Sequence, residues 1–245
     1  MPSDKKYIAV IVTIILVGAA IVGSITKLAY KELATIKKAQ TQEAHFLLST
    51  LDFKTEQQKI ILFIRDQILT EWARINYKKG NYDRAYGISS ALVRESLKYP
   101  YMPVPDMALL MAAMLKQESS FMDSAISSHG ATGIAQFMPS TARIIARILQ
   151  VEYSDTLLFN PEVAVRFQGA YLDIILSSHK YVIEPSLAEY NGGTWSAIYW
   201  KTDHSRLSPE TKAYVPEIMQ RFRGYQKAYK TYQVSLAAAK NTDTQ

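Results

Sequence analysis

The segment with the clearest chemical potential, residues 116–139, carries one acid near its start. Glu118 lies three residues beyond Leu115, the last residue of the apolar run 107–115. Poor hydration in such surroundings disfavours a charged carboxylate, so we expect the pKa of Glu118 to be raised. A carboxylic acid that keeps its proton near neutral pH is what general acid catalysis on a glycosidic oxygen requires.

The residues after Glu118 predict a loop suited to a polar ligand. Gly130 and Gly133 allow the backbone to turn sharply or to approach a ligand closely. Gln136 has both a donor and an acceptor, which match the hydroxyl and acetamide groups of sugars. Plainer roles stay open, because Ser127 also fits an ordinary turn and Gln136 and Met138 also fit a core or the start of a helix.

Three sequence blocks extend this pattern. The first reads E-S-x-F, S-x-x-G-A-x-G-x-x-Q and M-P-x-T-A over residues 118–142, the second A-x-Y-N-x-G over 188–193, and the third E-T-x-x-Y-V over 210–215. Together, and in this order, the blocks resemble the lytic transglycosylases of the soluble-transglycosylase type, which are relatives of goose-type lysozyme. The resemblance covers roughly residues 60–230.

The resemblance implies a reaction with a single acid. Glu118 would cleave the β-1,4 bond between N-acetylmuramic acid and N-acetylglucosamine and leave a 1,6-anhydro end, without a metal or cofactor. It also implies that the substrate-binding residues are Ser127, Gln136, Met138, Tyr190, Asn191 and Glu210, with the hydroxyl of Tyr190 donating a hydrogen bond near the acid.

Several of these residues have a second explanation. Tyr190 could be a core tyrosine, since the chain has 16 of them. Asn191 could hold its own loop instead of touching substrate. Glu210 follows Ser208-Pro209 and could simply stabilise the positive end of a helix dipole. The chain also departs from the family pattern: Ala135 stands where a methionine is common, and Glu189, next to Tyr190, stands where many relatives have alanine. Glu189 would shift the pKa of Glu118 if the fold brings the two acids together.

Two other functions remain open from the sequence. One is a module that grips glycan without cutting it, as part of an envelope machine. The other is a hydrolase of goose-lysozyme type, in which an acid such as Asp123 activates water. The presence of all three of Glu118, Gln136 and Tyr190 argues against the binding module. The lack of a second carboxylate at a family catalytic position argues against the hydrolase.

Composition narrows the partners. The 245 residues are 48% hydrophobic and 20% charged, which is typical of a globular protein, and the net charge of +6 suits polyanionic partners such as an acidic wall polymer or anionic lipid. No basic cluster is interleaved with aromatic residues, so we expect no nucleic acid. There is no cysteine, and the four histidines lack metal-ligand spacing: His45, His129, His179 and His204.

The first 29 residues predict a membrane anchor. Residues 7–26 are uncharged, and a helix of 20 residues is long enough to cross a bilayer. A cleaved signal and a buried core helix are the alternatives. Lysine counting favours a cytoplasmic C-terminal side, whereas the catalytic blocks favour the outer side of the inner membrane, in the periplasm. The lysines concerned are Lys5 and Lys6 before the span and Lys27, Lys31, Lys37 and Lys38 after it.

The rest of the chain reads as helical. We expect a helical stem at residues 30–54, an all-α, lysozyme-like transglycosylase domain at 55–232 behind the N-terminal transmembrane helix, and a flexible tail at 233–245. Apolar residues recur at helical spacing throughout the domain, and Asn160-Pro161-Glu162 is a strong signal for a helix start. Expected partners are peptidoglycan strands, the membrane, and envelope or secretion-machine proteins.

Overall fold

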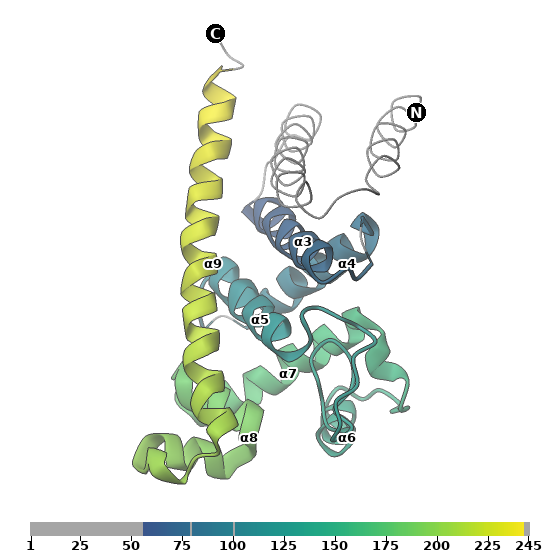
Figure 1. Ribbon diagram of the computed structural model, residues 1–245, viewed down its shortest axis with the longest axis vertical. Coiled ribbons are helices and arrows are strands. Elements are labelled where there is room, and N and C mark those ends of the chain that lie inside the picture. The colour runs from purple at the N-terminus through teal and green to yellow at the C-terminus, as the bar shows by residue number, and fades with distance from the viewer. Residues whose placement is uncertain (1–55, 79, 100, 243–245) are drawn as a thin grey trace, which may run out of the picture. The chain divides into compact units, whose positions relative to one another are not determined.

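The computed structural model describes residues 56–78, 80–99 and 101–242, all within one compact unit, Phe53–Gln245 (Figure 1). This part of the chain is helical, and in it β pairing is limited to isolated bridges between Ile126, Thr132 and Phe137. The elements in chain order are α3 (Glu56–Arg74), α4 (Tyr82–Ser96), α5 (Val104–Ser119), α6 (Pro139–Ile148), η1 (Leu157–Phe159), α7 (Pro161–Ser178), α8 (Ile183–Thr202), η2 (His204–Arg206) and α9 (Pro209–Thr242). The expected all-α fold is confirmed for these residues.

The predicted anchor at residues 1–29 and the stem at 30–54 lie outside the described residues. Within the described ranges, no helix has the length and apolar character needed to cross a membrane.

The central helix of the domain is α5. Every residue from 107 to 115 is at most 1% exposed. A helix that is apolar on all sides belongs in the interior, and α5 packs against α3, α4 and α9. The burial of this run therefore fixes where its C-terminal turn, which carries Glu118, emerges from the core.

The end of α9 differs from the expectation. The helix continues through residues 233–242, beyond the domain boundary that the sequence suggested at 232. Leu236 is buried, and the amide of Gln233 donates to Glu56 at the start of α3 over 2.9 Å. This segment of α9 is bonded to α3, and the sequence of the segment alone does not predict such a contact.

The chain leaves α5 through an unusual turn. Ser120 and Phe121 both have positive φ, 53° and 62°. Non-glycine residues in such conformations cost on the order of 1–3 kcal/mol each and persist only where surrounding contacts impose them. Two contacts do so here: the Phe121 ring is fully buried, and the indole N–H of Trp72 donates to the Phe121 carbonyl over 3.1 Å.

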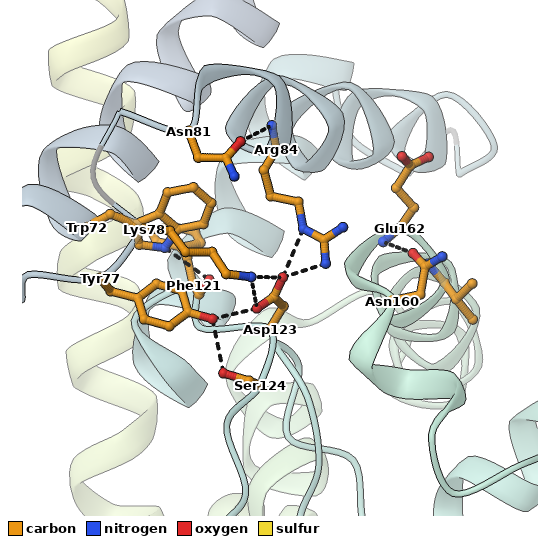
Figure 2. A network of polar contacts seen from close by, with 11 residues as sticks. Trp72, Tyr77, Lys78, Asn81, Arg84, Phe121, Asp123, Ser124, Asn160 and Glu162 are labelled. Carbon is orange, nitrogen blue, oxygen red and sulfur yellow. Dashed lines mark hydrogen bonds and ion pairs between the residues drawn. The ribbon is translucent and has the colours of Figure 1, made fainter.

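A buried carboxylate holds the next residues (Figure 2). Asp123 is 2% exposed and accepts bonds from the Lys78 ammonium at 2.7 and 2.8 Å and from the Arg84 guanidinium at 2.5 and 2.9 Å. Tyr77 donates a further bond of 2.5 Å. Burial alone would raise the pKa of Asp123, but these donors hold it below its ordinary value. Asp123 thus ties the turn after α5 to the segment between α3 and α4.

The loop between Asp123 and α6 depends on one close backbone approach. Gly133 has φ +76°, and its N–H donates to the Ala125 carbonyl over 2.8 Å. A Cβ atom at this position would lie 2.1 Å from the carbonyl oxygen of Leu158. Only glycine fits here, because the neighbouring atom belongs to backbone and cannot move aside.

We predict that Gly133→Ala destabilises the domain far more than Gly130→Ala. Gly130 also has positive φ, +84°, but a Cβ there would meet nothing within 4 Å. Gly130→Ala should lower the free energy of unfolding only by the cost of a left-handed backbone, about 1–2 kcal/mol. Gly133→Ala has the same cost and adds an overpacking cost of about 1–3 kcal/mol. Urea unfolding of the two variants measures the difference, and equal losses of unfolding free energy would contradict the close approach to Leu158.

Candidate active site

Glu118 lies in the last turn of α5, with its side chain partly accessible. Burial raises the pKa of its carboxyl group from 4.5 to about 7, the hydrogen bond from Tyr214 opposes that rise, and the charge of Glu210 adds to it. Desolvation is the largest of these effects, as the apolar run before Glu118 predicted. The carboxyl group therefore exchanges its proton near neutral pH.

The hydroxyl of Tyr214 donates directly to Oε1 of Glu118. Tyr214 belongs to α9 and is 5% exposed. Burial, together with the nearby carboxylate of Glu118, raises the pKa of Tyr214 well above 10, so the phenol keeps the proton that it donates. Sequence analysis assigned this residue no role, although it is the fixed tyrosine of the block at 210–215.

Residues on either side of Glu118 fix the end of α5. The Gln117 amide donates to Glu217 over 2.8 Å and accepts from Arg221 over 2.6 Å, and both partners are on α9. Their spacing from Tyr214, three and seven residues, places all three on one face of that helix. On the other side, the Ser119 hydroxyl donates to the Ile134 carbonyl over 2.7 Å.

Tyr190 supports the loop next to the acid. Its hydroxyl donates to the Ala135 carbonyl over 3.0 Å, and its ring packs edge-on against Phe137 and tilted against Tyr171. Burial raises the pKa of Tyr190 well above 10, and the charge of Glu118 adds to the rise, which places the two groups near each other. The expected hydrogen bond near the acid is therefore present, but its partner is a backbone carbonyl. The direct donor to the acid is Tyr214.

A kink in α8 joins the second sequence block to the third. Gly193 has φ 77° and ψ 179°, which interrupts the helix. Just before it, the Asn191 amide donates to Glu210 over 3.0 Å and accepts from the Thr211 hydroxyl over 2.7 Å. Of the two roles left open for Asn191, the structure shows the structural one. It also places Glu210, whose charge acts on Glu118.

The remaining predicted residues lie on the loop after α5. The hydroxyl oxygen of Ser127 accepts from the backbone of Ala131 over 2.9 Å, which is a turn contact. Gln136 has φ 49° and donates to the carbonyls of Gly133 at 2.8 Å and Ala125 at 3.2 Å. Met138, directly before α6, is 42% exposed. These contacts show how the loop is held, and Met138 presents the most accessible side chain of the three.

The other acids considered from the sequence have partners of their own. Asp123 is saturated by the network described above. Glu189 pairs with Nε2 of His179 at 2.5 Å and accepts from the Thr194 hydroxyl at 2.9 Å. The acid whose charge raises the pKa of Glu118 is Glu210, instead of Glu189. Within the described ranges, no group of three or more histidine, aspartate or glutamate side chains is placed to hold a metal ion.

We predict that Tyr214→Phe raises the pKa of Glu118 above its value of about 7, because the lost hydrogen bond favours the charged form. Tyr190→Phe is the matched control: it removes a hydroxyl that is bonded to Ala135, so the pKa of Glu118 should stay near 7. A carbon-13 NMR titration of the glutamate carboxyl groups measures both values. A shift with Tyr190→Phe and none with Tyr214→Phe would reverse the two assignments.

Comparison with known proteins agrees with this geometry. Residues 104–212 match the family described as the Transglycosylase SLT domain. A comparison with curated proteins gives no match. An inactive mutant of the lytic transglycosylase Slt from Pseudomonas aeruginosa is similar in structure, with a TM-score of 0.52 and 24% identity over 68% of this chain. The 70 kDa soluble lytic transglycosylase from Escherichia coli has a TM-score of 0.52 and 20% identity over 74% of this chain.

These likenesses have a defined extent. This chain spans 31% of the length of each of the two similar structures. At 20–24% identity, these similarities show the fold and not the function. The family match begins at the first residue of α5, contains Glu118 and Tyr190, and ends two residues before Tyr214. Residues 104–212 of this chain are therefore similar to the Transglycosylase SLT domain, the resemblance that the sequence blocks predicted.

Proposed function

We propose that this protein is a peptidoglycan lytic transglycosylase that uses Glu118 as its single acid and base. The observation that carries the proposal is the position of Glu118 in the last turn of α5, bonded to the Tyr214 hydroxyl, among the residues that match the Transglycosylase SLT domain. Burial there raises the pKa of Glu118 to about 7, near neutral pH. A catalytic group with a pKa near the working pH is present in both the acid and the base form, which is the most effective arrangement for proton transfer in both directions.

The proposed reaction has two proton transfers through the same carboxyl group. First, Glu118 gives its proton to the β-1,4 oxygen between N-acetylmuramic acid and N-acetylglucosamine, and the bond from C1 to that oxygen breaks with help from the 2-acetamido group. The carboxylate then takes the proton of the muramyl C6 hydroxyl as that oxygen bonds to C1. The result is a 1,6-anhydro end, and the carboxyl group recovers its proton without consuming water.

Tyr214 fits the second step. Its hydroxyl donates to Glu118, and such a bond favours the charged carboxylate over the neutral acid. Burial favours the neutral acid, and so does the charge of Glu210. The opposing influences keep the two protonation states close in free energy, which suits a group that must lose and regain one proton in each turnover.

A mechanism with two carboxylates has less support. Hydrolysis by two acids needs a second carboxylate that is free to activate water or to attack the sugar. Asp123 is buried and bonded to Lys78, Arg84 and Tyr77, and Glu189 is paired with His179. Glu210 is bonded to Asn191 and acts on the pKa of Glu118. Two experimental outcomes would replace the proposal: hydrolysis of the glycan, or binding of the glycan without cleavage.

The substrate would contact the loop that follows α5 and the kink of α8. We assign the contacts to side chains of these two segments and of the first turn of α9: Ser127, Gln136, Met138, Tyr190, Asn191 and Glu210. Ser127 and Gln136 also hold their own loop through hydrogen bonds, and Tyr190 and Asn191 bond α8 to that loop and to α9. Substrate recognition and loop geometry would thus depend on the same residues.

We predict that Glu118→Gln keeps glycan binding but lowers the cleavage of purified peptidoglycan by about a hundred- to ten-thousand-fold, because an amide cannot supply the proton. Glu152→Gln, which alters an exposed acid in the same way, should cleave at the wild-type rate. Mass spectrometry of the products identifies the reaction. Anhydro ends, lighter by one water than free reducing ends, support the proposal. Free reducing ends indicate a hydrolase, and wild-type turnover by Glu118→Gln removes its assigned role.

We also propose that residues 7–26 anchor the protein in the inner membrane and that residues from about 30 onward lie in the periplasm. The 20 uncharged residues support the anchor, and the location of peptidoglycan supports the orientation. Four lysines after the span and two before it argue the other way, but long domains are translocated largely regardless of such charges. A helical stem of residues 30–54 would extend at most roughly 38 Å, which confines cleavage to glycan near the membrane.

We predict that added protease digests the domain beyond residue 55 in spheroplasts with intact membranes. A cytoplasmic protein is the control and should survive until the membrane is lysed. Protection of the domain under the same conditions would mean that the orientation is inverted, and the cell-wall substrate would then be out of reach.

A further inference from the structure

The second half of α8 carries an aromatic pair in which Trp195 is exposed and Tyr199 is half-buried. The rings of Trp195 and Tyr199 are stacked, with centroids 6.0 Å apart and planes inclined by 29°. Trp195 is 68% exposed, the highest fraction among the large apolar side chains that the structure describes as exposed. The guanidinium carbon of Arg206 lies 4.2 Å from the centroid of the Tyr199 ring. We call these three residues the aromatic platform. Tryptophan, tyrosine and arginine are the residues most enriched where binding energy is concentrated.

The platform continues the proposed active site along the chain. Trp195 follows the kink at Gly193 by two residues, and Asn191, just before the kink, is bonded to Glu210. The charge of Glu210 acts in turn on Glu118. Directly before the kink, α8 also lies close to α9, because a Cβ at Gly192 would lie 2.8 Å from the hydroxyl oxygen of Thr211. In Figure 1, α8 and the first turns of α9 lie side by side, and the two helices are in contact.

The surroundings of the rings are polar. Exposed side chains with hydrogen-bonding groups flank the pair on the same segment: Thr194, Lys201, Thr202, Asp203, Ser205 and Arg206. The apolar neighbour is Ile198, which is 40% exposed. One exposed aromatic face among donors and acceptors differs from the large contiguous apolar patch that marks a membrane or protein interaction site. It matches a pyranose ring, which has one face of C–H groups and a rim of hydroxyl and amide groups.

We propose that the aromatic platform is a glycan subsite, on which one sugar ring of the peptidoglycan strand stacks against Trp195 beside the cleavage site. Tyr199 supports the tryptophan from behind, and Arg206 adds a cation close to the rings, which suits the carboxylates of muramyl sugars and their peptides. The proposal rests on the function proposed above, because it takes the same strand as its ligand. It assigns the strand a path from Glu118 past Asn191 and along the second half of α8.

The test measures binding separately from cleavage. The full chain carrying Glu118→Gln is titrated with a hexamer of N-acetylglucosamine, and affinity is measured by calorimetry. Loss of a stacking tryptophan should weaken binding by about tenfold or more in the double variant Glu118→Gln, Trp195→Ala, whereas Trp195→Phe should keep most of the affinity. The matched control is Tyr181→Ala. Tyr181 is also an exposed ring, 52% accessible and stacked on Tyr101 at 4.5 Å, but it lies just before the start of α8, away from the platform in the chain.

Tryptophan fluorescence gives a second readout. The chain has three tryptophans, of which Trp72 is fully buried and Trp200 partly buried, so quenching by acrylamide reports mainly on Trp195. The hexamer should protect this signal in the Glu118→Gln chain. Thermal melting checks that the Trp195 variants fold, which the 68% exposure of the side chain favours.

The outcomes separate the platform from the proposed function. Unchanged affinity in Trp195→Ala, or quenching that the hexamer does not alter, overturns the platform even if Glu118 proves essential for cleavage. A loss of affinity that is equal in Tyr181→Ala overturns it as well, as does the absence of any hexamer binding. Binding to phosphatidylglycerol vesicles that depends on Trp195, without hexamer binding, would replace the sugar with a lipid. If peptidoglycan is not cleaved at all but the Trp195-dependent affinity holds, the subsite stands and the transglycosylase proposal fails.

Discussion

The desolvation of one carboxyl group, just beyond the buried run of α5, is the constraint on which the site depends. Residues 107–115 of α5 stabilise the core and bring Glu118 to the point where the helix leaves it. The raised pKa has a cost in stability. Between pH 4.5 and about 7 the folded chain keeps a proton that the unfolded chain has released. The free energy of unfolding contributed by Glu118 is therefore fully present below pH 4.5 and is lost as the pH rises through 7.

The contacts around Glu118 show how a flexible loop is held beside a rigid acid. On one side, α9 fixes the end of α5 through Tyr214 and the paired contacts of Gln117. On the other, the strained turn at Ser120 and Phe121 redirects the chain, and Asp123 ties it to the segment before α4. A turn with two left-handed residues would be unstable alone. It persists because a buried aromatic ring, a tryptophan hydrogen bond and a buried ion-pair network all require the same geometry.

Local sequence was enough to predict some of this and not the rest. The apolar run before Glu118 predicted both its burial and its raised pKa, and Asn160 caps α7 as its position before a proline predicted. Tyr214 was missed because its partner lies 96 residues away, and no periodicity marks such a contact. The sequence placed the hydrogen bond of Tyr190 near the acid but could not name the Ala135 carbonyl as its acceptor, for a related reason. A motif indicates which residues meet, but the direction of each hydroxyl depends on packing between helices.

The two residues that tune Glu118 from outside α5 both come from the start of α9, and they act in opposite directions. Tyr214 stabilises the charged carboxylate, whereas Glu210 destabilises it. Because Glu210 is also bonded to Asn191 in the kink of α8, its distance from the acid depends on the geometry of that kink. A ligand that competes for Asn191 or shifts the kink would change the field at Glu118. The bond between Asn191 and Glu210 would thus couple a ligand at the kink of α8 to the proton affinity of the acid, without any contact between the ligand and α5.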